Sequence, residues 1–298
     1  TISSVGSGVV WTGTNSVSPN LWDLNNTVNW LIGGTPTTYI ENVPPGDAVT
    51  FNNLGSGLVL LSNTASPASV TISNTVNYTI LGTGGQINSA AGLTKVGTGS
   101  VTLNVPGNYS GNTVISNGPI SIGANQTWAN LSGNSAVDVS AGAPTITVNN
   151  SLNTTFAGSL NGALGLTKSG VGQFTLPGSN SFTGNLFVKA GGVTLSSGFL
   201  GLASFASIGQ NGTDDGTLTV KGTTVVAANN DFNVGDVGTS IGTLNVQDTA
   251  SLTVSSFYIG IAGALWGFVH LAQLEASAFD ISRSFQVLFM IIIGGLGS

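Results

Sequence analysis

The sequence predicts an all-β solenoid over about residues 10–260, followed by a short apolar tail that is expected to be helical. Three observations lead to this prediction: an unusual composition, a long repeat in which Gly92 aligns with Gly165, and a short repeat in which Gly216 aligns with Gly242. Charged residues make up only 5% of the 298-residue chain, against about 25% in an ordinary soluble domain. Gly, Thr, Ser and Asn take their place, and with abundant Val and Ile this composition favours strands and turns.

The composition of the chain excludes several classes of function. The chain carries five Lys and Arg against eleven Asp and Glu, a net charge of −6. It has no basic stripe that could bind a phosphate backbone, so no nucleic-acid partner is expected. The absence of Cys excludes disulfides, thiolate nucleophiles and zinc–thiolate sites. Residues 1–260 contain no apolar run of about 18 residues, so membrane contact is expected only through the tail at 261–298.

The long repeat lies in the middle of the chain. Residues 92–122 align without a gap with residues 165–195, and the two copies begin with GLTKVGTGSVTL and GLTKSGVGQFTL. Apolar residues alternate with polar ones in both copies, as at Val101 and Leu103 in the first. This period-two pattern is typical of half-buried strands, and the glycines between the apolar stretches predict tight turns.

The short repeat follows the long one. GTLTVKGTTVVAAN at 216–229 matches GTLNVQDTASLTVS at 242–255 without a gap. Self-similarity at this spacing is the signature of a solenoid, in which each repeat is one coil and stacks on the next at roughly 4.8 Å. The sequence therefore predicts a rod whose core continues from coil to coil.

The repeated phrase L-T-K-x-G-x-G-x-x-T-L, followed by an aromatic residue and a closing strand, resembles the autotransporter-associated β-strand repeat. Two copies lie at 93–123 and 166–198. The segment WTGTNSVSPNLWDLNNTVNW at 11–30 is similar to the lead-in that precedes such repeats in large secreted bacterial proteins. The resemblance implies a right-handed parallel β-helix, located outside the cell or on the bacterial surface, and implies no enzymatic activity. It divides the chain into a lead-in at 1–91, a repeat solenoid at 92–260 and a tail at 261–298.

Two of the few basic residues, Lys95 and Lys168, occupy the same place in the long repeat. The favoured interpretation is structural: each lysine caps a strand end at a coil corner beside two glycines and adds to solubility. The alternative is a ladder of cations along one edge that binds an acidic glycan or lipid.

Aromatic residues offer a second set of candidates. Tyr109 and Phe182 recur at one position of the long repeat, which favours an internal aromatic stack over a ligand surface. Four tryptophans are candidates for outward-facing platforms that stack on sugars: Trp11, Trp22, Trp30 and Trp128.

Catalytic residues are hard to find. The single His, His270, lies in the tail, which leaves no nucleophile triad. One acidic cluster, comprising Asp214, Asp215, Asp231 and Asp236, leaves a carbohydrate-active enzyme and a calcium site as alternatives. The favoured interpretation is a solvated turn, because residues 213–216 occupy the place that residues 239–242 take one coil later. We therefore predict no enzyme, no catalytic, cofactor-binding or metal-binding residues, and no cofactor.

The tail has a different composition and a different resemblance. The phrases AGALWG and SFQVLFMIIIGGLGS resemble part of the membrane permease of branched-chain amino acid ABC transporters. Three interpretations follow: a foreign segment joined to the solenoid near residue 260, a genuine helix that anchors or caps the rod, or a transporter. The third is the weakest, because nothing in residues 1–260 is long and apolar enough to span a membrane as a helix.

The function predicted from these features is that of a structural or adhesive passenger segment. It would be a stiff, protease-resistant spacer whose polar faces make weak, multivalent contacts with glycans or extracellular matrix. A carbohydrate-active enzyme on the same fold and a chimeric permease fragment are the alternatives.

Overall fold

The computed structural model describes residues 8–55, 57–202 and 205–259, which all lie in the compact unit Thr1–Ile259. These residues form 29 strands and no helix, so the prediction of an all-β fold is confirmed. None of them forms a helix long and apolar enough to cross a membrane. His270 and the permease-like tail, with its three interpretations, lie outside the described residues.

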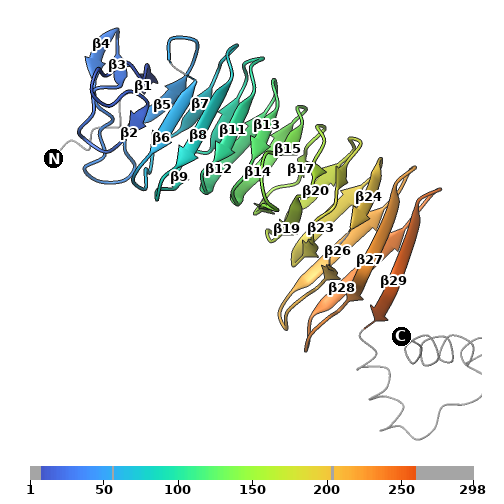
Figure 1. Cartoon of the computed structure of the whole chain (residues 1–298). Helices are drawn as coiled ribbons and strands as arrows, with labels where there is room; N and C mark the ends of the chain where they lie inside the picture. Colours follow the sequence, from blue (N-terminus) through green and yellow to red (C-terminus); the bar gives the residue numbers. More distant parts are fainter. Residues whose placement is uncertain (1–7, 56, 203–204, 260–298) are drawn as a thin grey trace, which may run out of the picture. The chain divides into compact units, whose positions relative to one another are not determined.

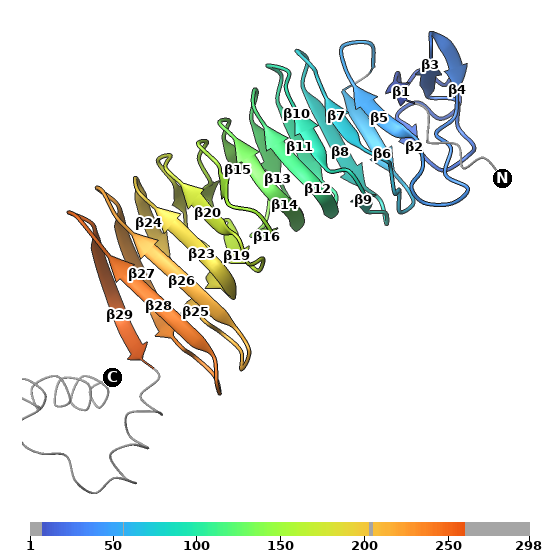
Figure 2. The same ribbon diagram turned by 180° about the vertical axis from the view of Figure 1, so that it is seen from behind.

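The strands stack in chain order as the coils of a parallel solenoid (Figure 1), also seen from behind in Figure 2. Each complete coil contributes one strand segment to each of three parallel ladders. Ladder one contains β1 (Gly8–Trp11), β5 (Ala48–Phe51), β7 (Val70–Ile72), β10 (Leu93–Lys95), the second halves of β12 (Gly107–Ile115) and β14 (Gln126–Gly133), β17 (Thr154–Thr155), β20 (Gln173–Leu176), β23 (Ala190–Leu195), β26 (Asp215–Val220) and β28 (Ile241–Val246).

The other two ladders are built in the same way. Ladder two contains β2 (Leu21–Trp22), β6 (Leu58–Leu61), β8 (Tyr78–Gly82), β11 (Val101–Asn104), β13 (Ile120–Ile122), β15 (Val137–Val139), β18 (Asn161–Gly162), β21 (Ser181–Phe182), β24 (Phe199–Leu202) and the first halves of β27 (Val225–Val234) and β29 (Ser251–Ile259). Ladder three contains β9 (Ile87–Ser89), the first halves of β12 and β14, β16 (Thr145–Val148), β19 (Gly165–Lys168), β22 (Leu186–Val188), β25 (Ala206–Ile208) and the second halves of β27 and β29.

The coil length changes along the solenoid. In the middle, one coil leads from Leu166 to its pairing partner Leu186, and the next leads from Leu186 to Ala206. Toward the end the coil is longer, since Gly216 pairs with Gly242. These two glycines are the ones that the short repeat aligns, so the prediction that the short repeat corresponds to one coil is confirmed.

The long repeat is out of phase with the coils. In ladder one, β10 is followed by β12, β14, β17 and β20, with one strand for each coil. The second copy begins with β19, which comes after β17 but before β20 in the chain, so the two copies are not a whole number of coils apart. Consequently β10, which opens the first copy, lies in ladder one between β7 and β12, whereas β19, which opens the second, lies in ladder three between β16 and β22. One sequence motif thus builds corners between different pairs of ladders.

An aromatic cluster fills the beginning of the solenoid. The hairpin of β3 (Trp30–Ile32) and β4 (Thr35–Thr37) pairs antiparallel with β1, and beneath it the rings of Trp11 and Trp30 lie 5.0 Å apart. The prediction of outward-facing tryptophans is wrong, because Trp11, Trp22, Trp30 and Trp128 are all buried. The period-two pattern directs them inward; Trp128, for example, pairs with the buried residues Tyr109 and Val148 of the neighbouring coils.

Candidate functional site

The two lysines of the long repeat are fully buried, each with 0% of its surface exposed. Lys95 Nζ donates hydrogen bonds to the carbonyl oxygens of Gly97, in its own coil, and of Asn117, in the next coil, at 2.9 Å. Lys168 Nζ donates in the same way to Gly170 O and, at 3.0 Å, to Ala190 O. Each ammonium group therefore binds two successive coils together at a corner.

These contacts decide between the interpretations of the lysines. Capping of a corner beside two glycines is confirmed, but a contribution to solubility is wrong because neither side chain reaches water. A cation ladder along one edge is also wrong, since Lys95 and Lys168 are buried and belong to different ladders.

A buried asparagine in the preceding coil completes each corner. Asn74 Nδ2 donates to Val76 O of its own turn and, at 3.1 Å, to Ser100 O of the next coil. Asn150 Nδ2 donates to Leu152 O at 2.7 Å and to Gln173 O at 3.0 Å. We call the two arrangements the lysine corners.

Close backbone approach explains the glycines of the motif. A Cβ on Gly97 would lie 2.0 Å from Asn74 O, and one on Gly170 would lie 2.1 Å from Asn150 O. Real Cβ atoms do not come this close to a backbone oxygen, so the stacked turns admit only glycine there.

Burial lowers the pKa of Lys95 and of Lys168 from 10.5 to about 8. Between pH 8 and 10.5 the unfolded chain therefore binds more protons than the folded chain, and stability rises with pH. Burial also raises the pKa of Tyr78 to about 12 and raises those of Tyr39 and Tyr109. Above pH 10 the unfolded tyrosines ionise first, so stability falls with pH.

We therefore expect the melting temperature to rise above pH 8, to pass through a maximum near pH 10 and then to fall. Thermal unfolding followed by circular dichroism from pH 7 to 11 measures this profile. Lys168→Met is expected to weaken the rise, whereas Lys221→Met is expected to keep it. A melting temperature that falls steadily from pH 7 contradicts the assignment.

The recurring aromatic residues Tyr109 and Phe182 are both buried, which confirms internal packing. The prediction that they form one aromatic stack is wrong, because Tyr109 lies in ladder three and Phe182 in ladder two. The repeat offset explains this separation as it explains that of the lysines.

The acidic residues are placed in turns and at strand ends. Asp214 accepts hydrogen bonds from the backbone N–H groups of Gln210, at 3.2 Å, and Asn211, at 2.9 Å, which closes its own turn. Asp236 accepts one from the Ser207 hydroxyl at 3.1 Å. Asp215 pairs with Ile241, as the alignment of the two turns predicts. Within the part of the chain that the structure describes, no three His, Cys, Asp or Glu residues are grouped closely enough to hold a metal ion.

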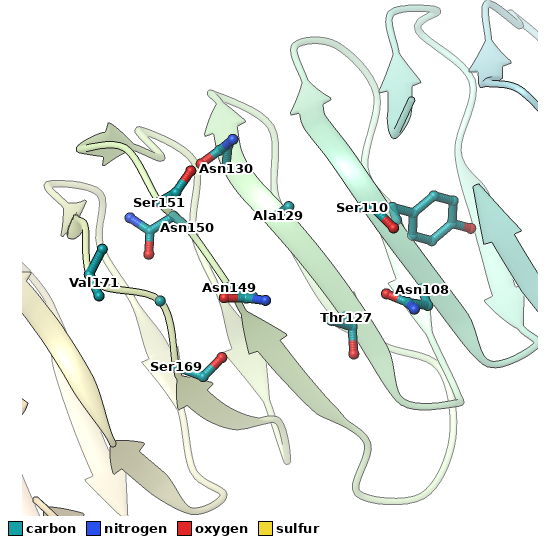
Figure 3. Close-up of a pocket in the computed structure, with 12 residues that line it drawn as sticks. Asn108, Ser110, Thr127, Ala129, Asn130, Asn149, Asn150, Ser151, Ser169 and Val171 are labelled. Carbon is teal, nitrogen blue, oxygen red and sulfur yellow. The ribbon is translucent and has the colours of Figure 1, made fainter. Parts of the chain in front are cut away.

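A polar groove of about 560 Å³ crosses the corner between ladders three and one (Figure 3). Asn108 and Ser110 line one side, Asn149 and Ser169 line the other, and Thr127 and Ala129 lie between them. Its complete lining is Asn108, Tyr109, Ser110, Thr127, Ala129, Asn130, Asn149, Asn150, Ser151, Ser169, Gly170 and Val171. The groove is the candidate binding site of the described solenoid.

Comparison with known protein families identifies the motif. The model of the passenger-associated-transport-repeat matches residues 93–121 and 166–198. The chain carries two passenger-associated transport repeats. The two matches begin at the first residues of the L-T-K phrases and contain both corner lysines, so the resemblance inferred from these phrases is confirmed. No curated protein and no solved structure matches the chain.

Each passenger repeat depends on a residue outside the matched segment. The stretch from Asn74 to Lys95 is longer than that from Asn150 to Lys168, so the alignment that superimposes the lysines does not superimpose the asparagines. The only sequence signal is an asparagine that follows closely after a strand-ending Ile72 or Val148. This asparagine can be recognised as part of the lysine corner only when the coil register is known.

Proposed function

We propose that the chain is a structural and adhesive segment of an autotransporter passenger, exported to the bacterial surface, with no catalytic activity. The passenger repeats together with the parallel solenoid fit an autotransporter passenger domain. The observation that carries the proposal is the lysine corner, a purely structural use of the family motif. The solenoid acts as a spacer whose exposed polar side chains contact glycans or matrix.

Uncharged contacts between coils support a role outside the cell. Asn77, Asn125 and Asn153 each accept a backbone N–H from the following coil through Oδ1, at 3.1, 2.9 and 2.8 Å. Such neutral hydrogen bonds are screened by salt far less than surface ion pairs are. A spacer built in this way keeps its stability when the ionic strength of its surroundings changes.

The proposal is tested by surface exposure of the chain in its own host. An epitope placed in the exposed turn at residues 140–143 is expected to bind antibody on intact cells. Proteinase K added to those cells is expected to remove the epitope signal while a cytoplasmic marker survives. An epitope that is reached only after the cells are permeabilised contradicts the proposal.

A further inference from the structure

The groove exists because the corner between ladders three and one changes shape along the solenoid. Trp128 pairs with Val148 and Gly133 with Phe156, yet the stretch from Val148 to Phe156 is longer than that from Trp128 to Gly133. At β12 and β14 the strand continues around the corner, whereas after β16 and β19 the chain forms wider turns. The wider turns therefore form one wall of the groove, with Asn149, Ser169 and Val171, opposite the side that β12 forms, and β14 lies between the two (Figure 3).

The lining of the groove is polar and uncharged. Its side chains are amides, hydroxyls and small residues, and none of these described residues carries a formal charge. The side chains of Asn108, Asn149 and Ser169 make no hydrogen bond to another described residue, which leaves their donors and acceptors available. Val171, with 77% of its surface exposed, adds an apolar contact at the wall.

We propose that this groove binds a neutral oligosaccharide that runs along the solenoid axis. Sugar rings present hydroxyl groups at their edges and C–H groups on their faces, which match the free amides and hydroxyls and the exposed Val171. The net charge of −6 disfavours acidic glycans, and the lining supplies no cation to hold one. The lining contains no Asp, Glu or His that could act as a general acid or base, and its Tyr109 hydroxyl is buried, which raises its pKa, so we infer that the site binds and does not cleave.

The groove also defines the length of its ligand. It is lined by four successive coils, those of β12, β14, β16 and β19, whose neighbours are about 4.8 Å apart. The three steps between them span about 14 Å, close to the length of three or four linked sugar rings. A tetrasaccharide therefore fills the groove, and further rings lie outside it.

The site rests on the adhesive part of the proposed function, and titration calorimetry of the purified full chain tests it separately from export. Neutral cello-, xylo- and manno-oligosaccharides of two to six rings are the probes, and tetragalacturonate is the acidic comparison. We expect at least one neutral series to bind with a dissociation constant on the order of 1 mM. Its affinity is expected to increase up to four rings, to remain level beyond four, and not to change between 50 and 500 mM NaCl.

Matched variants locate the binding. Asn108→Ala combined with Asn149→Ala removes free amides from both sides of the groove and is expected to weaken tetrasaccharide binding about tenfold or more. Asn117→Ala combined with Asn134→Ala changes two exposed asparagines outside the groove and is expected to leave binding unchanged. Melting curves confirm that all variants are folded.

Three results would overturn the site. The first is no binding of any neutral series at 10-fold the expected dissociation constant. The second is binding that both double variants retain equally. The third is salt-sensitive binding that favours tetragalacturonate. Each of these results leaves surface export and the spacer role intact, because those are measured on cells by the epitope.

Discussion

Replacing Gly170 with alanine is expected to lower the free energy of unfolding by about 3 kcal/mol, at the upper end of the usual cost of overpacking. The added Cβ would lie 2.1 Å from Asn150 O and 2.5 Å from both the carbonyl carbon and the nitrogen of Asn150. These are backbone atoms of the preceding coil, so no side-chain rotation can relieve the clash. The two coils must move apart, which also weakens the Lys168 and Asn150 hydrogen bonds that join them to their neighbours.

A matched glycine separates this clash from the general effect of adding a methyl group. Gly212 also lacks a positive φ, and the nearest atom to a Cβ there is Thr239 Oγ1 at 3.9 Å. Gly212→Ala is therefore expected to change stability by less than about 0.5 kcal/mol. Gly97→Ala, with a Cβ 2.0 Å from Asn74 O, is expected to match Gly170→Ala. Urea unfolding of the variants measures the differences, and equal stability of Gly170→Ala and Gly212→Ala would contradict the close packing of the coils.

The sequence was sufficient to predict strands, coils and corners, because period-two alternation and glycine punctuation are local signals. The pairing of Asp215 with Ile241 followed directly from the short repeat. The long repeat did not predict the coil length in the same way, because the sequence distance between its two copies is not a whole number of coils. Only the strand register shows that β10 and β19 lie in different ladders.

Burial of particular side chains was less predictable. Lysine is almost never fully buried unless it is paired, so an exposed Lys95 was the natural expectation. Its burial depends on carbonyl oxygens from two coils, Gly97 O and Asn117 O, which lie one whole coil apart in the sequence. The groove could not be predicted either. It arises because the stretch from Val148 to Phe156 is longer than the matching stretch of the preceding coil, and only the register shows which stretches match.

Replacing Lys168 with methionine is expected to lower the free energy of unfolding by about 2 kcal/mol at pH 7. Two effects oppose each other. Methionine relieves the cost of burying an ammonium group, which the lowered pKa of Lys168 reports. It also leaves Gly170 O and Ala190 O without their donor, and an unsatisfied buried carbonyl costs about 1–3 kcal/mol. Because two carbonyls lose one donor group, the loss is expected to exceed the relief.

The pH dependence of this loss distinguishes the lysine corner from simple packing. Below pH 8 the wild-type ammonium is charged, so methionine removes the full cost of burying that charge. Above pH 8 the wild-type amine is neutral and still donates to both carbonyls, so methionine removes no such cost and only loses the hydrogen bonds. The difference between wild type and Lys168→Met is therefore expected to increase from pH 7 to 9.5. Lys221→Met, at a partly exposed lysine, is expected to stay within about 0.5 kcal/mol of wild type throughout. If Lys168→Met is as stable as wild type at pH 9.5, the lysine does not join the coils and packing around its aliphatic chain alone holds the corner.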